Sequence, residues 1–146
     1  EEPGLYGSYA LVALLQQYPQ MEIELSINLD MIGHPDRRKA IYMEGQKNLV
    51  DFESIEQELM QKTQLCIKTH RSNLLSGRMN KTDWLRASDH YPFHQAGYPW
   101  VYFGVPPHAQ YHTPEDTIDT LDIDFIVAVA ETVYQMISID KLTKAP

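Results

Sequence analysis

Two strand-like segments separated by helical patterns constrain the fold of this chain more than any other feature. Apolar and polar residues alternate from Glu22 to Leu29, which is typical of a strand with one buried face. A second segment, Tyr98 to Val105, is rich in aromatic and β-branched residues, as expected for a fully buried strand. Strands separated by helices predict an α/β fold, here a three-layer αβα sandwich with a mostly parallel central sheet.

Helical spacing and capping residues predict the helices of this sandwich. We expect N-caps at Ser8, Asp51 and Ser88, with the first helix ending at Pro19 and the third at Gly97. The expected core-facing positions of the first two helices are Leu11, Leu14, Leu15 and Tyr18, then Phe52, Ile55, Leu59 and Cys66.

The last predicted helix runs from Asp124 to Ile139, and Ala40 to Glu44 reads as a short strand. The apolar stripe of that helix comprises Ile126, Val129, Val133, Met136 and Ile137. Residues 69 to 86 show no pattern that predicts an element.

Length and composition narrow the class of protein. A chain of 146 residues suits one domain, and we treat residues 1–146 as part of a single domain. The net charge of −8 argues against a nucleic-acid partner, because such domains usually present a basic face. The longest apolar run, from Ala10 to Leu15, is too short for a membrane span. The single cysteine, Cys66, excludes an internal disulfide and a cysteine-based zinc cluster.

Two potential metal ligands follow the two predicted strands. Asp30 ends the first strand, and His112 lies in the loop after the second. In sheets of this kind the ligand-binding crevice lies outside the carboxyl ends of the strands. We therefore expect both side chains at the same edge of the sheet.

Four sequence blocks occur in order along the chain. They are Glu1 to Ser8 (EEPGLYGS), Ile27 to Gly33 (INLDMIG), Ser88 to Phe93 (SDHYPF) and Tyr111 to Thr117 (YHTPEDT). Together they closely resemble the co-catalytic di-zinc aminopeptidases of peptidase clan MH, which are related to glutaminyl cyclases and glutamate carboxypeptidases. The resemblance extends over about residues 1 to 138, and it implies the zinc-exopeptidase version of the sandwich.

The resemblance implies a role for each matching residue. Glu1 corresponds to the general base, and Glu2 to a carboxylate ligand that shares one zinc ion with His112. Asp30 corresponds to the aspartate that binds the other zinc ion. The residues expected to line or brace the site are Tyr111, Ser88, Asp89 and His90.

These residue types suit the implied chemistry. Carboxylates and imidazoles are common zinc ligands, and paired metals share a water molecule of lowered pKa. A free carboxylate beside that water can take its proton and pass it to the leaving amine. The implied activity of the parent protein is therefore removal of N-terminal residues from peptides, with two zinc ions per complete domain.

The family carries a further histidine ligand and a metal-bridging aspartate before the Glu-Glu pair, and these 146 residues hold neither. We expect the chain to be the C-terminal portion of a larger peptidase domain. By itself it should be inactive and bind zinc at this site weakly or not at all, because a catalytic zinc typically needs three protein ligands. The sheet edge that truncation exposes would favour self-association.

Two alternatives stay open at this point. The first is a glutaminyl cyclase, whose single-zinc chemistry would give a different metal stoichiometry. The second is a non-catalytic relative that serves as a binding or scaffold domain. Export to the periplasm or the cell exterior is common in the family and is our expectation for the parent. No role is assigned to His34, His70 or His108.

Overall fold

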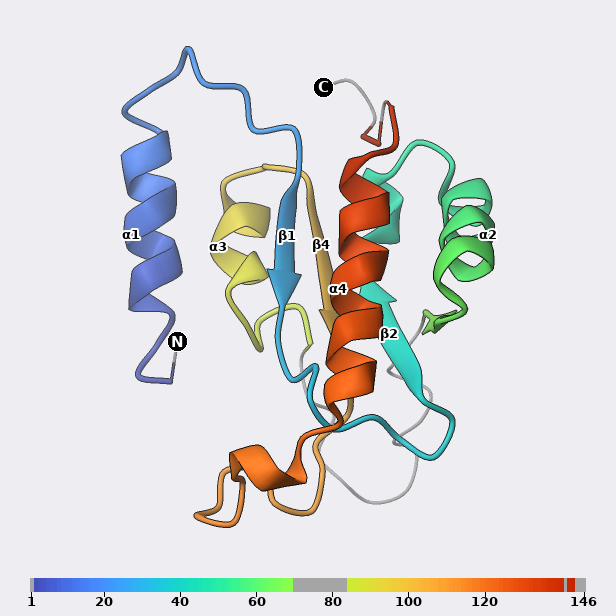
Figure 1. Ribbon diagram of the computed structural model, residues 1–146. Helices are drawn as coiled ribbons and strands as arrows, with labels where there is room; N and C mark the ends of the chain where they lie inside the picture. Colours follow the sequence, from blue (N-terminus) through green and yellow to red (C-terminus); the bar gives the residue numbers. More distant parts are fainter. Residues whose placement is uncertain (1, 70–83, 141, 144–146) are drawn as a thin grey trace.

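The computed structural model describes residues 2–69, 84–140 and 142–143 of the chain. The helices are α1 (Tyr6–Leu15), α2 (Phe52–Thr63), α3 (His90–Gln95) and α4 (Ile123–Ile137), with short 3-10 turns at Gln46–Asn48 and Ile118–Thr120. The strands are β1 (Ser26–Leu29), β2 (Ala40–Glu44), β3 (Cys66–Lys68) and β4 (Trp100–Gly104). Figure 1 shows α4 crossing the sheet, with the loops after β1 and β4 gathered at its lower end.

The sheet has the strand order β1-β4-β2-β3. β1 is parallel to β4, with Ser26 opposite Trp100 and Leu29 opposite Phe103. β2 is parallel to β3 but antiparallel to β4. The predicted, mostly parallel sheet is therefore confirmed, and the carboxyl ends of β1 and β4 lie at the same edge.

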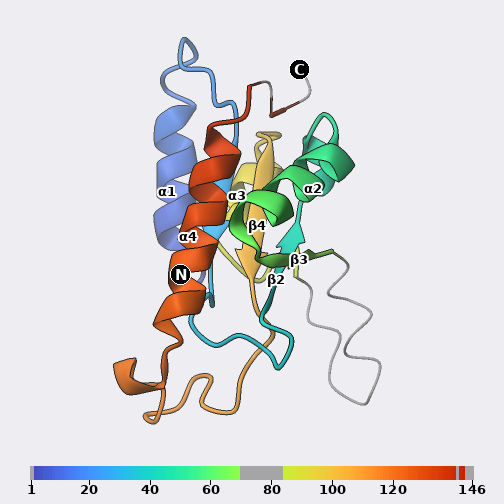
Figure 2. The ribbon, with the colours of Figure 1, turned by 45° about the vertical axis from the view of Figure 1, so that its right-hand side comes forward.

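Helices cover both faces of the sheet, which completes the predicted three-layer sandwich (Figures 1 and 2). On one face, α2 and α4 pack on a mainly aliphatic core that includes Leu59 and Val129 together with Phe103. On the other face, α1 and α3 pack on a smaller, mainly aromatic cluster. That cluster consists of Val12, Phe93, Trp100 and Tyr102.

The first helix differs from the prediction in its start and in its buried face. Its N-cap is Leu5, and the Ser8 hydroxyl lies inside the helix and donates to the Leu5 carbonyl oxygen at 3.0 Å. The side that contacts the sheet layer carries Ser8 and Val12, whereas Leu11 and Leu14 are 46% and 48% exposed. Apolar residues of this helix occur on all of its sides, so helical spacing alone could not predict which side is buried.

Three further predictions are corrected in detail. Cys66 does not belong to α2, because Gln64 adopts a left-handed conformation that ends the helix, and Cys66 begins β3. The N-cap of α3 is Asp89 rather than Ser88, although the helix does end just before Gly97. Ile137 of α4 is 58% exposed, and Thr132 is buried on the core side instead. The N-cap at Asp51 and the strand at 40–44 are confirmed. The strand predicted at 98–105 is present as the shorter β4, and the strand predicted from Glu22 begins only at Ser26, as β1.

None of the helices in the described part of the chain is long and apolar enough to cross a membrane.

Candidate metal centre

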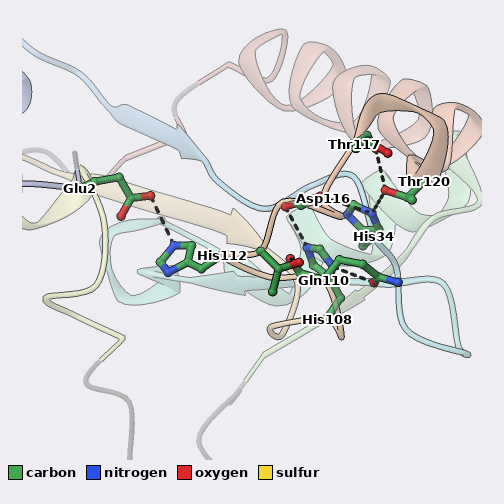
Figure 3. A network of polar contacts seen from close by, with 9 residues as sticks. Glu2, His34, His108, Gln110, His112, Asp116, Thr117 and Thr120 are labelled. Carbon is green, nitrogen blue, oxygen red and sulfur yellow. Dashed lines mark hydrogen bonds and ion pairs between the residues drawn. The ribbon is translucent and has the colours of Figure 1, made fainter.

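Glu2 and His112 meet at the edge of the sheet although they are far apart in sequence. Glu2 Oε1 lies 3.4 Å from His112 Nε2, as Figure 3 shows. Two ligand atoms bound tetrahedrally to one zinc ion at about 2.0–2.1 Å lie about 3.3–3.4 Å apart. The observed separation therefore matches a pair of ligands on the same ion. Both side chains are exposed in the described part of the chain.

Asp30 lies in the same cavity. This cavity has a volume of about 170 Å³, and Glu2, Asp30 and His112 all contribute to its wall. Its remaining lining residues are Met31, Trp84, Ala87, Tyr102, Pro107 and Tyr111. The structure thus brings together the three predicted zinc ligands that it describes. Glu1, the predicted general base, lies outside the described residues.

Backbone contacts hold Asp30 at the end of β1. Its amide donates to the Phe103 carbonyl oxygen at 3.0 Å, and its own carbonyl oxygen accepts from the Tyr102 hydroxyl at 3.5 Å. A Cβ atom at Gly104 would collide with that carbonyl oxygen and with the Tyr102 hydroxyl. Glycine at this position is therefore what allows β4 to approach the Asp30 backbone so closely.

Two residues of the site adopt a conformation that is rare outside glycine. Met31, directly after Asp30, has φ +57°, and His112 itself has φ +58°. Such conformations cost about 1–3 kcal/mol each and cluster at functional sites. The surrounding contacts must stabilise both conformations. They change the direction of the chain next to Asp30 and at His112, two of the predicted ligands.

Tyr111 packs directly against the predicted histidine ligand. The two rings are stacked, with centroids 3.8 Å apart and planes 22° apart. Tyr111 also lines the cavity. This position is compatible with the predicted lining role, because the ring limits the orientations that the imidazole can adopt.

Ser88 and His90 contact Asn28 of β1 and do not line the cavity. The side-chain amide of Asn28, two residues before Asp30, donates to Ser88 Oγ at 2.8 Å and approaches His90 Nδ1 at 3.4 Å. His90 Nε2 donates to the Trp84 carbonyl oxygen at 3.0 Å. These bonds connect the predicted bracing residues to the strand that presents Asp30.

Burial sets the charge of His90. Its side chain is 1% exposed and stacks on Trp100 with ring centroids 4.6 Å apart. Desolvation lowers the pKa of His90 to about 4, and the bond to the Trp84 carbonyl opposes this effect only in part. His90 is therefore neutral at pH 7, which agrees with a bracing role and not with a charged contact to substrate.

Asp89 lies elsewhere. It contributes to a separate depression beside α1, together with Ser8, Leu11 and Asn28. In this structure it does not line the cavity of Glu2, Asp30 and His112. Its predicted role in bracing or substrate binding stays a prediction.

The described residues also hold a group of potential metal ligands that the sequence analysis missed. His34, His108 and Asp116 each offer a ligand atom within 4.8 Å of the others. None of them belongs to the predicted site. The positions of the two histidines in the sequence could have indicated this group. His34 and His108 lie in the loops that follow the same two strands as Asp30 and His112.

Comparison with known proteins defines the class to which this fold and this site belong. The model of peptidase family M28 matches residues 1–137, so the chain belongs to this family. Aminopeptidase YwaD of Bacillus subtilis (strain 168) is 30% identical over 158 residues, which cover 99% of this chain and 32% of that protein. The chain thus spans about a third of the length of this relative.

Solved structures agree with the sequence comparison. BSAP, a zinc aminopeptidase from Bacillus subtilis, is 25% identical and superposes with a TM-score of 0.61 over 90% of this chain and 32% of its own. The LapA aminopeptidase of Legionella pneumophila gives a TM-score of 0.70 at 14% identity, covering 97% of this chain and 37% of its own. The latter similarity establishes the fold alone, and it confirms the predicted architecture.

Proposed function

We propose that this chain is the C-terminal part of a zinc-dependent aminopeptidase that removes N-terminal residues from peptides. The observation that carries the proposal is the cavity at the carboxyl ends of β1 and β4, where Glu2, Asp30 and His112 come together. Membership in family M28 and the similarity to proteins named as aminopeptidases support the same activity.

The residues of the proposed site have different roles in this reaction. Glu2 and His112 would hold one zinc ion, since their ligand atoms already lie at the required spacing, and Asp30 would hold the second. Zinc supplies Lewis acidity, which polarises the scissile carbonyl and lowers the pKa of a water molecule toward about 7. Glu1, next to Glu2 in sequence, would take a proton from that water and give it to the leaving amine.

The cavity also offers side chains that could contact a peptide. Glu2 and His112 are exposed in the described part of the chain. Tyr111 and Tyr102 present aromatic side chains to the same cavity. Tyr111, which is exposed, would contact the N-terminal residue of the substrate or the peptide behind it.

Hydrolysis of aminoacyl p-nitroanilides by the longer parent protein, supplied with zinc, tests the proposal. We expect hydrolysis by the parent and a loss of at least ~10²-fold in kcat for Glu1→Gln, because that substitution removes the base while keeping the side-chain size. An unchanged rate in this variant would refute the assigned role. Glutamine-cyclising activity with one zinc ion per chain would favour the glutaminyl cyclase instead.

A substitution at an exposed acidic residue away from the cavity provides the matched control. Glu53→Gln lies in the first turn of α2, outside the cavity wall. It makes the same change in charge and size as Glu1→Gln, and we expect parent activity to remain within about twofold, as for a surface substitution.

The isolated 146-residue chain should not hydrolyse these substrates. It carries only Glu2 and His112 for one proposed zinc position and Asp30 for the other, fewer than the three protein ligands of a typical catalytic site. Measurable turnover by the purified chain would show that the missing ligands come from elsewhere, for example from a second copy.

Export of the parent and self-association of the isolated chain are also proposals. We propose that it is exported, as is common in the resembling family. We further propose that the isolated chain self-associates through β1, which pairs only with β4 among the described strands. Light scattering of the purified chain over a range of concentrations tests the second proposal.

A further inference from the structure

A second cluster of metal-ligating side chains lies beside the proposed peptidase site and shares no residue with it. His34 lies in the loop after β1, and His108 and Asp116 lie in the segment between β4 and α4. Their ligand atoms lie within 4.8 Å of one another. Figure 3 shows the three side chains converging while Glu2 and His112 form a separate pair.

The distances between ligand atoms in this cluster are longer than hydrogen bonds and close to the separation of two ligand atoms on one metal ion. Asp116 Oδ1 lies 3.8 Å from His34 Nε2, and Asp116 Oδ2 lies 3.6 Å from His108 Nε2. Hydrogen bonds between such atoms are normally 2.7–3.2 Å long. Two ligand atoms on one tetrahedral zinc ion lie about 3.3–3.4 Å apart, so closure by a few tenths of an ångström would complete the geometry.

His108 directs one ring nitrogen toward Gln110 and the other toward Asp116. His108 Nδ1 faces the amide oxygen of Gln110 at 3.4 Å, and because that oxygen can only accept, Nδ1 carries the proton. In the neutral ring, Nε2 then presents a lone pair to the carboxylate of Asp116. A cation placed between these two atoms would form a favourable bond with each of them.

The other imidazole is also held in place. Thr120 donates its hydroxyl proton to the Thr117 carbonyl oxygen at 2.6 Å, so it accepts from His34 Nε2 at 2.9 Å. The rings of His34 and His108 are stacked, with centroids 3.7 Å apart and planes 14° apart, and each side chain is only 15% exposed. The two rings are thus held next to each other in the structure, with His34 Nε2 bonded to Thr120.

We propose that His34, His108 and Asp116 form a zinc site separate from the proposed peptidase centre. Two imidazoles and a carboxylate are a common zinc ligand set, and water would occupy the fourth position. Binding through His34 Nε2 requires its proton to move to Nδ1, which exchanges the bond to Thr120 for a bond to the ion.

Zinc at this site would fix the segment that presents His112. The ring of His108 packs edge-on against Tyr111 with centroids 6.3 Å apart, and Tyr111 stacks on His112. The Tyr111 amide also donates to the His108 carbonyl oxygen at 3.1 Å. A bond from zinc to His34 therefore ties the loop after β1 to the segment between β4 and α4. Each of these carries a residue of the proposed peptidase centre.

Isothermal titration of the purified 146-residue chain with zinc chloride alone tests the proposal. We expect one zinc ion per chain in the wild type, and the same affinity in the double variant Glu2→Gln, His112→Gln, which disables the other centre. The affinity should fall by more than about 100-fold in His34→Gln and in His108→Gln, since loss of a direct ligand exceeds the 10–100-fold cost of losing an outer partner. Asp116→Asn keeps the side-chain shape and should weaken binding as well.

Two results would overturn the proposal. One is zinc binding that survives His34→Gln and His108→Gln but disappears with Glu2→Gln, His112→Gln. The other is no binding by a wild-type chain that circular dichroism shows to be folded. As a second measurement, zinc should raise the Tm of the wild type and of the double variant by more than that of Asp116→Asn. None of these readouts depends on peptidase activity, so failure of the proposed function would leave the result unaffected.

Discussion

The two faces of the sheet are built for different tasks, and β4 shows this within one strand. Val101 and Phe103 point into the aliphatic core beneath α2 and α4. Trp100 and Tyr102, which alternate with them, belong to the aromatic cluster beneath α1 and α3. Every residue of β4 is buried, yet the two sets of neighbours differ in chemistry.

The difference indicates that one face of the sheet mainly contributes stability and the other mainly positions the site. The α2–α4 face packs aliphatic side chains with few polar groups, which favours stability. The α1–α3 face holds polar groups such as His90 and Ser88, whose bonds to Asn28 support the strand that presents Asp30. The outer side of α1 also leaves Tyr6 and Leu14 exposed. This face therefore contributes less apolar burial and more positioning.

The largest expected effect comes from the same substitution made in the two layers. Leu59→Ala removes a fully buried side chain from α2 and should lower the free energy of unfolding by about 2–5 kcal/mol. Leu11→Ala, on the exposed side of α1, should change it by less than about 0.5 kcal/mol. Urea unfolding of both variants measures the difference. Equal losses would contradict the exposed position of Leu11 on α1.

A second prediction concerns the contact between the first residue of β4, Trp100, and the turn after β2. Gly45 has φ +88°, and a Cβ atom there would collide with the carbonyl oxygen and ring of Trp100. Gly97 has φ +79° but no atom within 4 Å of such a Cβ. Both alanine variants lose the conformational freedom of glycine, but Gly45→Ala should lose about 1–3 kcal/mol more, the usual cost of overpacking. Thermal unfolding of the pair checks this, and identical Tm values would show that the turn can move.

A third prediction uses acid to weaken the aromatic face selectively. The pKa of His90 is about 4 in the folded protein and near 6.5 when unfolded, so the unfolded state binds more protons between these values. The contribution of neutral His90 is complete above about pH 6.5 and is lost as the pH falls toward 4. We expect this residue to account for about 3 kcal/mol of that loss.

The variant His90→Gln isolates this effect, because glutamine does not titrate. Its free energy of unfolding should fall less steeply than that of the wild type between pH 6.5 and 4. Parallel curves would mean that His90 is more accessible to water than its 1% exposure indicates.

The smallest expected effect compares helix caps on the two faces. The Asp51 carboxylate accepts from the Ser54 amide at 3.3 Å at the start of α2, so Asp51→Ala should cost about 1 kcal/mol. Asp89 occupies the same position of α3 without a side-chain capping bond. Asp89→Ala should therefore stay within about 0.5 kcal/mol. Chemical denaturation of both variants measures the contrast, and a larger loss at Asp89 would reveal a bracing contact at that residue.

Local patterns were sufficient where one physical effect dominated. The alternation before Asp30 and the apolar segment at 98–105 predicted β1 and β4, because side chains in a strand must point to alternate faces. Asp51 predicted the start of α2 since its carboxylate can satisfy a free amide. The ordered motif blocks predicted the family, which the match over residues 1–137 confirms.

Patterns failed where neighbours in space decide the outcome. Leu11 and Leu14 look like core residues, yet α1 turns the side with Ser8 and Val12 inward. Cys66 fits the helical spacing of α2, but the left-handed turn at Gln64 ends that helix and moves Cys66 into β3. In both cases the competing arrangement differs only in contacts that are distant in sequence.

The sequence by itself determined the class of fold, the edge of the sheet where Asp30 and His112 lie, and the ligand types that suit zinc. Only the tertiary structure decided that Glu2 comes within 3.4 Å of His112 and that His34 stacks on His108. The physical reason is that periodicity and capping act over a few residues. A metal site, in contrast, requires side chains from separate loops to converge within a few ångströms, and only the packed sheet fixes that geometry.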